Sequence, residues 1–115
     1  MPKGKRRRKH IPHPKSYYDL SEVVQKINDG QLLIRQNAEQ CALGDFGWGR
    51  SEIIKVYEML KAKHFQHTMP SKINPLWIND VYKVHLFGED VYTHFYINDS
   101  TGKLVINSFK RDQIV

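Results

Sequence analysis

Cysteine is nearly absent from this sequence: Cys41 is the single one among 115 residues. One cysteine cannot form an internal disulfide, so the chain does not fit the disulfide-rich secreted domains. A lone thiol is also a poor basis for a metal site, because structural zinc sites are built from several Cys and His ligands. Cys41 lies in an apolar stretch, and we expect it to be a buried structural thiol rather than a reactive one.

Long apolar segments are also missing. No run approaches the ~20 residues that cross a bilayer, and the N-terminus lacks the apolar stretch of a signal peptide. These absences predict a cytoplasmic protein that does not enter membranes. Apolar residues make up 40% and charged residues 26% of the chain, which is ordinary for a globular protein. A length of 115 residues is enough for one domain.

Acidic residues are absent from the first 16 positions, which hold seven of the 18 Lys and Arg residues. The remainder carries 11 basic against all 12 acidic residues, so the basic charge belongs mainly to this tail. Like charges and Pro2, Pro12 and Pro14 oppose ordering, and we predict a disordered basic tail over residues 1–15. The tail is either an arm that contacts nucleic acid by displacing counterions from phosphates, or a solvated end.

Helical patterns dominate the first half of the chain. Leu20, Val23, Val24 and Ile27 fall at i, i+3, i+4 and i+7, the spacing of one apolar stripe on a helix. Phe46 and Trp48 stand among three closely spaced glycines, and we expect both rings to seal the core rather than to stack on a base. Ser51 is the expected N-cap of the last helix. Helices are thus predicted at about 20–28, 37–43 and 51–63, with a possible short strand at 31–35.

From His64 onward the pattern changes to alternation, and Gly-containing turns separate its segments. Strands are predicted at 64–69, 78–87, 91–98 and 103–110. The predicted fold is therefore α+β, with N-terminal helices packed on a C-terminal antiparallel sheet of three to four strands. The helices should cover one face of this sheet and leave the other face available.

One predicted strand carries side chains suited to nucleic acid. Tyr92, His94 and Tyr96 should share the face opposite the core, since successive residues of a strand alternate. Aromatic and polar side chains together can stack on bases and contact phosphates. The same residues are also common on an ordinary half-exposed sheet face, so this pattern alone leaves both interpretations open.

The predicted sheet also holds the residue types that cleave RNA without a metal. Attack of the RNA 2′-OH on the neighbouring phosphorus needs a base, a cation for the developing charge and an acid for the leaving oxygen. His67 belongs to a residue type that can act as base or acid near neutral pH, Lys110 supplies positive charge, and tyrosine can donate a hydrogen bond or a proton. No His-Glu-x-x-His motif or cysteine pair is present, so no metal or other cofactor is expected.

Four short motifs occur in order along residues 65–110. They are Phe65-Gln66-His67-Thr68-Met69, then Trp77 followed by Asp80-Val81-Tyr82, then Val91-Tyr92, and last Ser108-Phe109-Lys110. In this order and spacing the chain resembles the MqsR-type toxins of bacterial toxin–antitoxin systems, which are small ribonucleases related in fold to RelE. The likeness extends over the N-terminal helix and covers roughly residues 13–110.

The resemblance implies one RelE-like ribonuclease domain over residues 16–115, which cleaves messenger RNA and is held in check by a cognate antitoxin protein. It assigns catalytic roles to Tyr92 and Lys110. His67 stands where the family has a lysine, and Asn79 stands near the position of a family glutamine, with one extra residue before it. His94 is the reserve proton donor.

Further RNA contacts are expected from Tyr96, Lys83 and Arg111. The competing function classes are a non-catalytic nucleic-acid-binding module, which would use the same face without cutting, and a protein-interaction module that pairs through a sheet edge.

Overall fold

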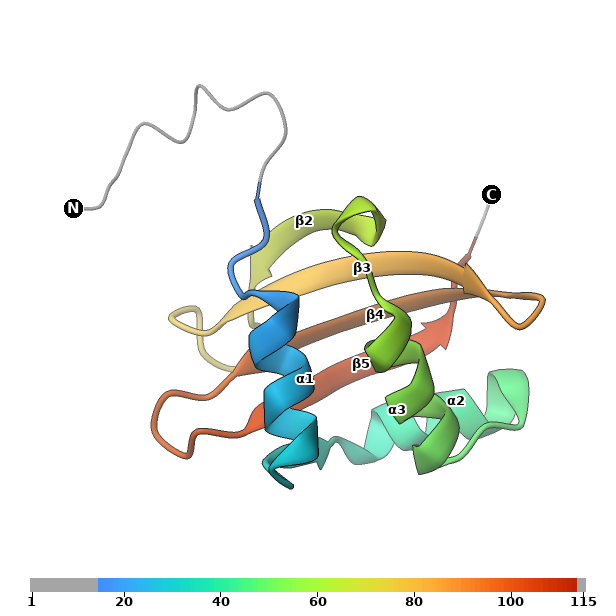
Figure 1. The fold of residues 1–115 in the computed structure, drawn as a ribbon, viewed down its shortest axis with the longest axis horizontal. Coiled ribbons are helices and arrows are strands. Elements are labelled where there is room, and N and C mark those ends of the chain that lie inside the picture. Colours follow the sequence, from blue (N-terminus) through green and yellow to red (C-terminus); the bar gives the residue numbers. More distant parts are fainter. Residues whose placement is uncertain (1–14, 114–115) are drawn as a thin grey trace.

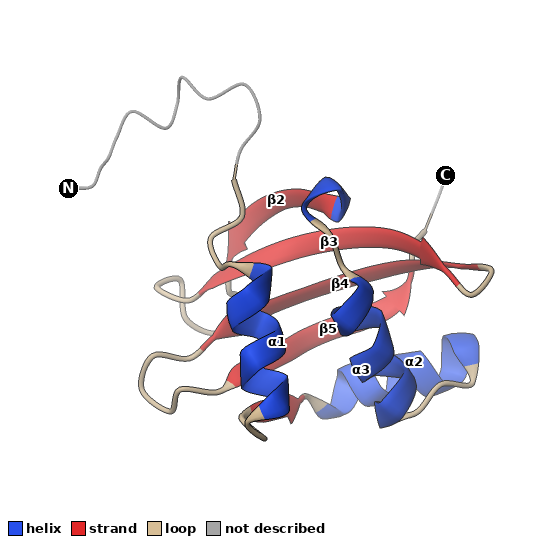
Figure 2. Cartoon of the chain, in the orientation of Figure 1, coloured by secondary structure: helices blue, strands red, loops and turns tan. Residues whose placement is uncertain are grey.

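Three α-helices pack against a five-stranded mixed sheet in the computed structural model, which describes residues 15–113 (Figures 1 and 2). The predicted basic tail lies outside the described residues, except for Lys15. The helices are α1 (Leu20–Asn28), α2 (Gln36–Phe46) and α3 (Arg50–Met59), followed by a short 3-10 turn at Ala62–His64. The strands are β1 (Leu32–Ile34), β2 (Phe65–Pro70), β3 (Ile78–Leu86), β4 (Glu89–Ile97) and β5 (Leu104–Arg111).

The α+β class is confirmed, but the prediction of three to four antiparallel strands is wrong. The sheet has five strands in the order β1-β5-β4-β3-β2, and β1 pairs with β5 in parallel. β1 spans only three residues, too few to display alternation, and Leu32 pairs with Leu104. Neither its pairing direction nor its partner could be predicted from its own sequence. A relation to the RelE fold stays a prediction.

The first helix has the predicted bounds, whereas the other two differ. α2 continues through Gly44 to Phe46 and is capped by Gly47, whose positive φ of 73° suits glycine. α3 begins before Ser51, because the Gly49 amide donates a 2.8 Å hydrogen bond to the Glu52 carboxylate. It ends at Met59, where Leu60 turns to extended backbone. No helix among the described residues is long and apolar enough to cross a membrane.

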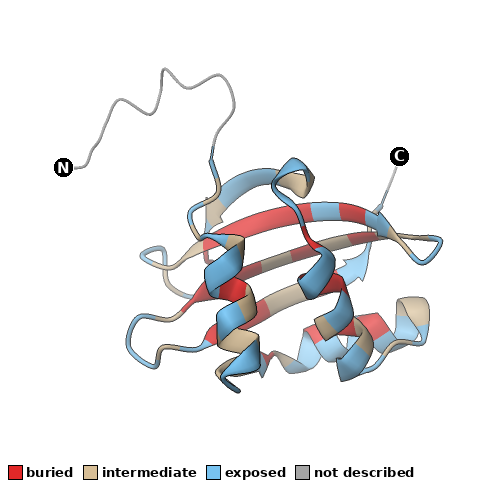
Figure 3. Cartoon of the chain, in the orientation of Figure 1, coloured by how far each residue is buried: buried red, intermediate tan, exposed pale blue. Residues whose placement is uncertain are grey.

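The core lies between the helices and one face of the sheet, where α1 and α3 run side by side (Figures 1 and 3). Val23, Ile53 and Phe109 are fully buried there. Phe46 and Trp48 pack against this core, as predicted, with ring centroids 4.4 Å apart. The central strands carry most of the buried positions of the sheet.

The prediction of a buried Cys41 is wrong. Ala38 and Ala42, one helical turn apart, face the core and are almost fully buried, so the intervening Cys41 points outward and is exposed. The apolar character of the stretch came from alanines on the inner side of α2, and it said nothing about the outer side.

Candidate functional site

The sheet face that points away from α1 and α3, here called the open face, carries most of the candidate residues. Strand register places Lys83, Tyr92 and Lys110 in one row across β3, β4 and β5. The next row is His67, Val81, His94 and Ser108. Tyr92 and His94 therefore share one face, as predicted, and both lie next to Lys110.

A β-bulge in β2 decides where His67 points. Phe65 pairs with Tyr82, but His67 pairs with Val81, so Gln66 is an extra residue in the strand. Phe65 consequently packs on the core side, where its ring lies 5.6 Å from that of Tyr82. In a regular strand His67 would share that side with Phe65, whereas the bulge turns His67 onto the open face.

A second bulge shapes β5. His94 pairs with Ser108 and Phe95 with Ile106, which leaves Asn107 as the extra residue. Asn107 and Ser108 both line a groove on the open face. The Asn107 carbonyl also accepts a 3.3 Å hydrogen bond from the Asn37 side chain at the start of α2. The bulge therefore turns two consecutive side chains toward the groove.

The groove has a volume of about 530 Å³ and runs between the start of α2 and the β2–β3 loop. Among the described residues, Arg35, Lys72 and Lys110 are the cationic ones that line it, and no carboxylate does so. The polar and aromatic lining residues are Asn37, Ser71, Asn79, Tyr92, His94, Asn107 and Ser108. The groove is therefore suited to an extended anionic ligand.

Tyr92, His94 and Lys110 form a cluster in the groove, in which Tyr92 contacts both of the others. The Tyr92 hydroxyl lies 3.1 Å from Nδ1 of His94, and the two rings meet edge to face. Lys110 Nζ lies 5.2 Å from the Tyr92 ring centroid, in cation–π contact. Lys110 is held beside the phenol and forms no ion pair with an acidic side chain of residues 15–113, so its charge is available to the groove.

Burial and positive neighbours keep the cluster in defined protonation states. Burial, together with the charges of Lys110, His67 and Lys72, lowers the pKa of His94 to about 4. Burial, with a smaller contribution from Asp112, raises the pKa of Tyr92. Near neutral pH, His94 is therefore an uncharged imidazole and Tyr92 an uncharged phenol. The role of reserve acid is thus unfavourable for His94.

The lowered pKa of His94 predicts that acid weakens the fold. Between pH 6.5 and about 4 the unfolded chain binds a proton at this residue and the folded chain does not. The free energy of unfolding should therefore fall as the pH falls through this window, by about 1–2 kcal/mol after allowance for partial exposure. Urea unfolding at pH 7 and pH 4.5 measures this change. His94→Asn should lose that component, and an equal pH dependence in both proteins would contradict the prediction.

His67 and Asn79 flank the cluster in different ways. His67 is exposed and is not a lining residue of the groove, but its position across Val81 lets its charge act on His94. Asn79 lines the groove and is only 1% exposed. Its Oδ1 is buried without a hydrogen-bond partner among the described residues. A buried amide oxygen normally has a hydrogen-bond donor, and within the part of the chain that the structure describes the Asn79 oxygen lacks one.

The three residues expected to add RNA contacts are placed less favourably. Tyr96 is 3% exposed and stacks on Trp77 with ring centroids 5.0 Å apart, so its ring is covered. Lys83 lies on the open face, but its ammonium contacts Asp112 at 3.4 Å. The structure brings neither side chain into the groove.

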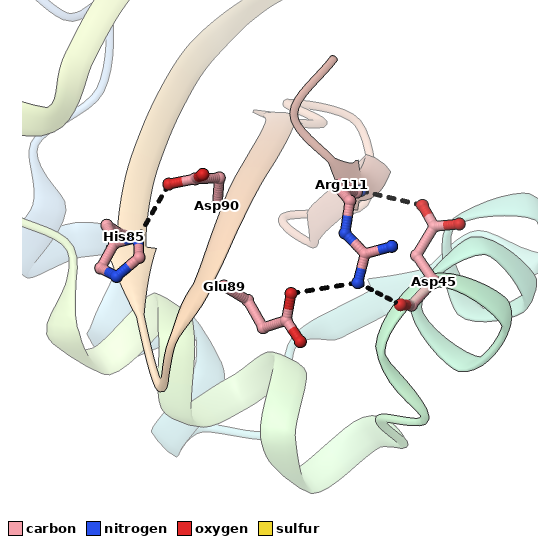
Figure 4. A network of polar contacts seen from close by, with 5 residues as sticks. All are labelled: Asp45, His85, Glu89, Asp90 and Arg111. Atoms are coloured by element: carbon pink, nitrogen blue, oxygen red, sulfur yellow. Dashed lines mark hydrogen bonds and ion pairs between the residues drawn. The ribbon is translucent and has the colours of Figure 1, made fainter. Parts of the chain in front are cut away.

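Arg111 lies on the other side of β5 from Lys110. Its guanidinium donates to the Asp45 carbonyl at 2.7 Å and to Glu89 at 3.0 Å (Figure 4). The guanidinium also lies over the Phe46 ring, 5.3 Å from its centroid. The backbone amide of Arg111 also donates to the Asp45 carboxylate at 2.9 Å. Arg111 therefore ties β5 to α2 and to the β3–β4 hairpin, away from the groove.

Sequence reasoning missed the residues that the loops and bulges contribute. Arg35 precedes α2, Lys72 belongs to the β2–β3 loop, and Asn107 is the bulged residue. Nothing in local periodicity distinguishes these residues from other polar residues. Among the described residues, no group of three or more His, Cys, Asp or Glu side chains could hold a metal ion.

Comparison with protein families identifies the family of this chain. The family described as "Motility quorum-sensing regulator, toxin of MqsA" matches residues 15–111. The chain belongs to the MqsR toxin family. The matched range includes every strand and the whole lining of the groove. A comparison with curated proteins found no match.

Membership in the MqsR family makes the chain a toxin of a toxin–antitoxin system, whose partner is an antitoxin of the MqsA kind. This confirms the resemblance drawn from the ordered motifs. In an MqsR-family chain, the cationic groove that contains Tyr92 and Lys110 is the natural candidate for the toxic activity.

Proposed function

We propose that this toxin is a metal-independent endoribonuclease that cleaves messenger RNA through attack of the RNA 2′-OH. The observation that carries the proposal is the groove, which combines three cationic residues with the Tyr92–His94–Lys110 cluster and is lined by no carboxylate of residues 15–113. A polyanion gains affinity in such a groove by releasing counterions. The groove lies on an open sheet surface, which suits a single strand with its bases splayed out.

In the proposed reaction the substrate supplies its own nucleophile. The 2′-oxygen bonds to phosphorus, the bond from phosphorus to the 5′-oxygen breaks, and the products are a 2′,3′-cyclic phosphate and a 5′-OH. One proton leaves the 2′-oxygen and one proton reaches the 5′-oxygen. Neither transfer requires a metal ion or a protein nucleophile, and the extra negative charge of the phosphorane must be stabilised.

Each role has a candidate in or beside the groove. Lys110 would stabilise the phosphorane, and the place of its ammonium beside Tyr92 in the groove supports this role. His67 would carry one of the two proton transfers, since an imidazole can act as base or acid near neutral pH. Tyr92 would position the reacting nucleotide or protonate the leaving oxygen.

The remaining lining residues would hold the strand. Asn79 would contact the substrate through its amide. Arg35 and Lys72, which line the groove with Lys110, would take the flanking phosphates. Their charges would bind ground state and transition state alike, so they should affect binding more than the chemical step.

Purified protein should cleave RNA in the presence of EDTA, and His67→Ala should lower the rate by about 100-fold or more, because general acid–base groups contribute on that scale. Sequencing of the RNA ends should identify 2′,3′-cyclic phosphates. The matched control is His85→Ala: His85 is also an exposed strand histidine, but it contacts Asp90 at 2.8 Å near the β3–β4 hairpin (Figure 4). This control should cleave like the wild type.

Equal cleavage by wild type and His67→Ala would exclude the role of His67. Loss of activity in EDTA that added metal restores would exclude metal independence. Tight binding of RNA without any cleavage would favour the non-catalytic nucleic-acid-binding module over an enzyme. A different result would be a toxin that neither binds nor cleaves RNA and still inhibits a process that the antitoxin restores. That result would favour the protein-interaction module.

A further inference from the structure

A hydrogen bond joins His94 and Tyr92, and none of the catalytic roles proposed above uses it. The two residues are separated by one position on β4, and their side chains share the open face. The bond joins the Tyr92 hydroxyl and Nδ1 of His94 at 3.1 Å, and the rings meet edge to face with centroids 5.7 Å apart. Both residues line the groove. Such a bond fixes the torsion of a hydroxyl that would otherwise rotate.

The surroundings of His94 decide which partner donates. Lys110 and Lys72 line the same groove, His67 lies in the same row as His94, and no carboxylate in the described part of the chain lines the groove. These charges, added to burial, disfavour the imidazolium, so Nδ1 and Nε2 share a single proton. A bare imidazole nitrogen is a strong acceptor, whereas a phenol oxygen is a weak one. The stronger arrangement therefore has the Tyr92 O–H donating to a bare Nδ1.

We propose that His94 is a positioning residue, which accepts the Tyr92 O–H at Nδ1 and thereby presents the Tyr92 oxygen to the groove as a hydrogen-bond acceptor. His94 itself then keeps its proton on Nε2. The part of this inference that concerns RNA rests on the proposed ribonuclease function, whereas the hydrogen bond itself does not.

This arrangement gives Tyr92 a defined chemical role. Because its own proton is directed to His94, the phenol is not the acid for the leaving oxygen. Its oxygen can instead accept a hydrogen bond from the donor groups of the bound nucleotide, among which the reacting 2′-OH is the one next to the scissile phosphate. Lys110, over the same ring, keeps a positive charge beside this position. Tyr92 would thus orient the 2′-OH, and Lys110 would neutralise negative charge on the neighbouring scissile phosphate.

The hydrogen bond between Tyr92 and His94 can be tested in the free protein, without any substrate. Long-range proton–nitrogen NMR spectra of the histidine rings report which nitrogen carries the proton, and His94→Asn identifies the signal of His94. We expect a neutral ring with the proton on Nε2 that does not titrate between pH 8 and about 5, and a changed Nδ1 shift in Tyr92→Phe. A proton on Nδ1, or titration of His94 near 6.5, would overturn the proposal even if the protein never cleaves RNA.

Cleavage by a set of His94 variants tests the role toward substrate. Asparagine can place an acceptor near the position of Nδ1, glutamine reaches the position of Nε2, and leucine offers neither. His94→Leu and His94→Gln should lower kcat by about 10- to 100-fold, whereas His94→Asn should recover most of that loss. If His94 transferred a proton, all three variants would lose activity equally, and the pH profile would lose one limb.

A double variant separates positioning from a general effect on the fold. If His94 acts through the Tyr92 hydroxyl, His94→Leu should have little further effect on kcat in a Tyr92→Phe background. Additive losses in the double variant would overturn the proposal. Absence of cleavage by the wild type would instead count against the ribonuclease function, and the NMR result would still decide the state of His94.

Discussion

Replacing Lys110 with alanine is expected to lower RNA cleavage by roughly 100- to 1000-fold, the usual effect of removing one group that stabilises a developing negative charge. Lys110 is exposed, lines the groove and is held beside Tyr92 by a cation–π contact. Its loss should therefore act on kcat, with little change in the melting temperature. Single-turnover cleavage of a defined RNA, with a thermal melt of the same sample, measures both quantities.

Two matched variants sharpen this test. Lys110→Arg keeps the positive charge and should retain part of the activity. Lys83→Ala removes a lysine from the same row of the sheet, but one whose ammonium contacts Asp112 outside the groove. We expect Lys83→Ala to cleave within a few-fold of the wild type. Similar losses for Lys83→Ala and Lys110→Ala would indicate a general effect of charge and would contradict a specific role for Lys110.

Replacing the preceding residue, Phe109, with alanine should have a different consequence. Phe109 is fully buried on the core side of β5 and lies 6.0 Å from the Phe46 ring, edge to face. The lost apolar contacts and the resulting cavity should lower the free energy of unfolding by about 3–5 kcal/mol. This is a large part of the stability of a typical small domain, so part of the protein should be unfolded at 37 °C. Urea unfolding followed by tryptophan fluorescence measures the change.

The control for Phe109 is the exposed Phe87. Phe87 is 57% exposed in the β3–β4 turn and contacts Trp48 edge to face at 5.9 Å. Phe87→Ala should therefore lower the free energy of unfolding by about 1 kcal/mol or less. Equal losses for both variants would contradict the assignment of Phe109 to the core. Lys110 and Phe109 are adjacent in the chain, so their contrasting effects would also test which face of β5 borders the groove.

Local patterns in the sequence determined the elements with enough residues to show a period. The apolar stripe of residues 20–28 predicted α1 with its bounds. Alternation and glycine-containing turns predicted the four longer strands, and the ordered motifs led to the MqsR family. The placement of Tyr92 and His94 on one face followed from alternation alone. These features depend on residues close to one another in the chain.

The tertiary structure alone decided how these elements combine. Pairing between distant segments fixed β1 against β5 in parallel, and the bulges at Gln66 and Asn107 decided which side chains reach the open face. Packing covered Tyr96 with Trp77 and tied Arg111 to Asp45. The physical reason is that a period describes one strand or helix by itself. Strand register, bulges and the covering of one side chain by another arise only when two segments meet. In this protein they determine which residues form the groove.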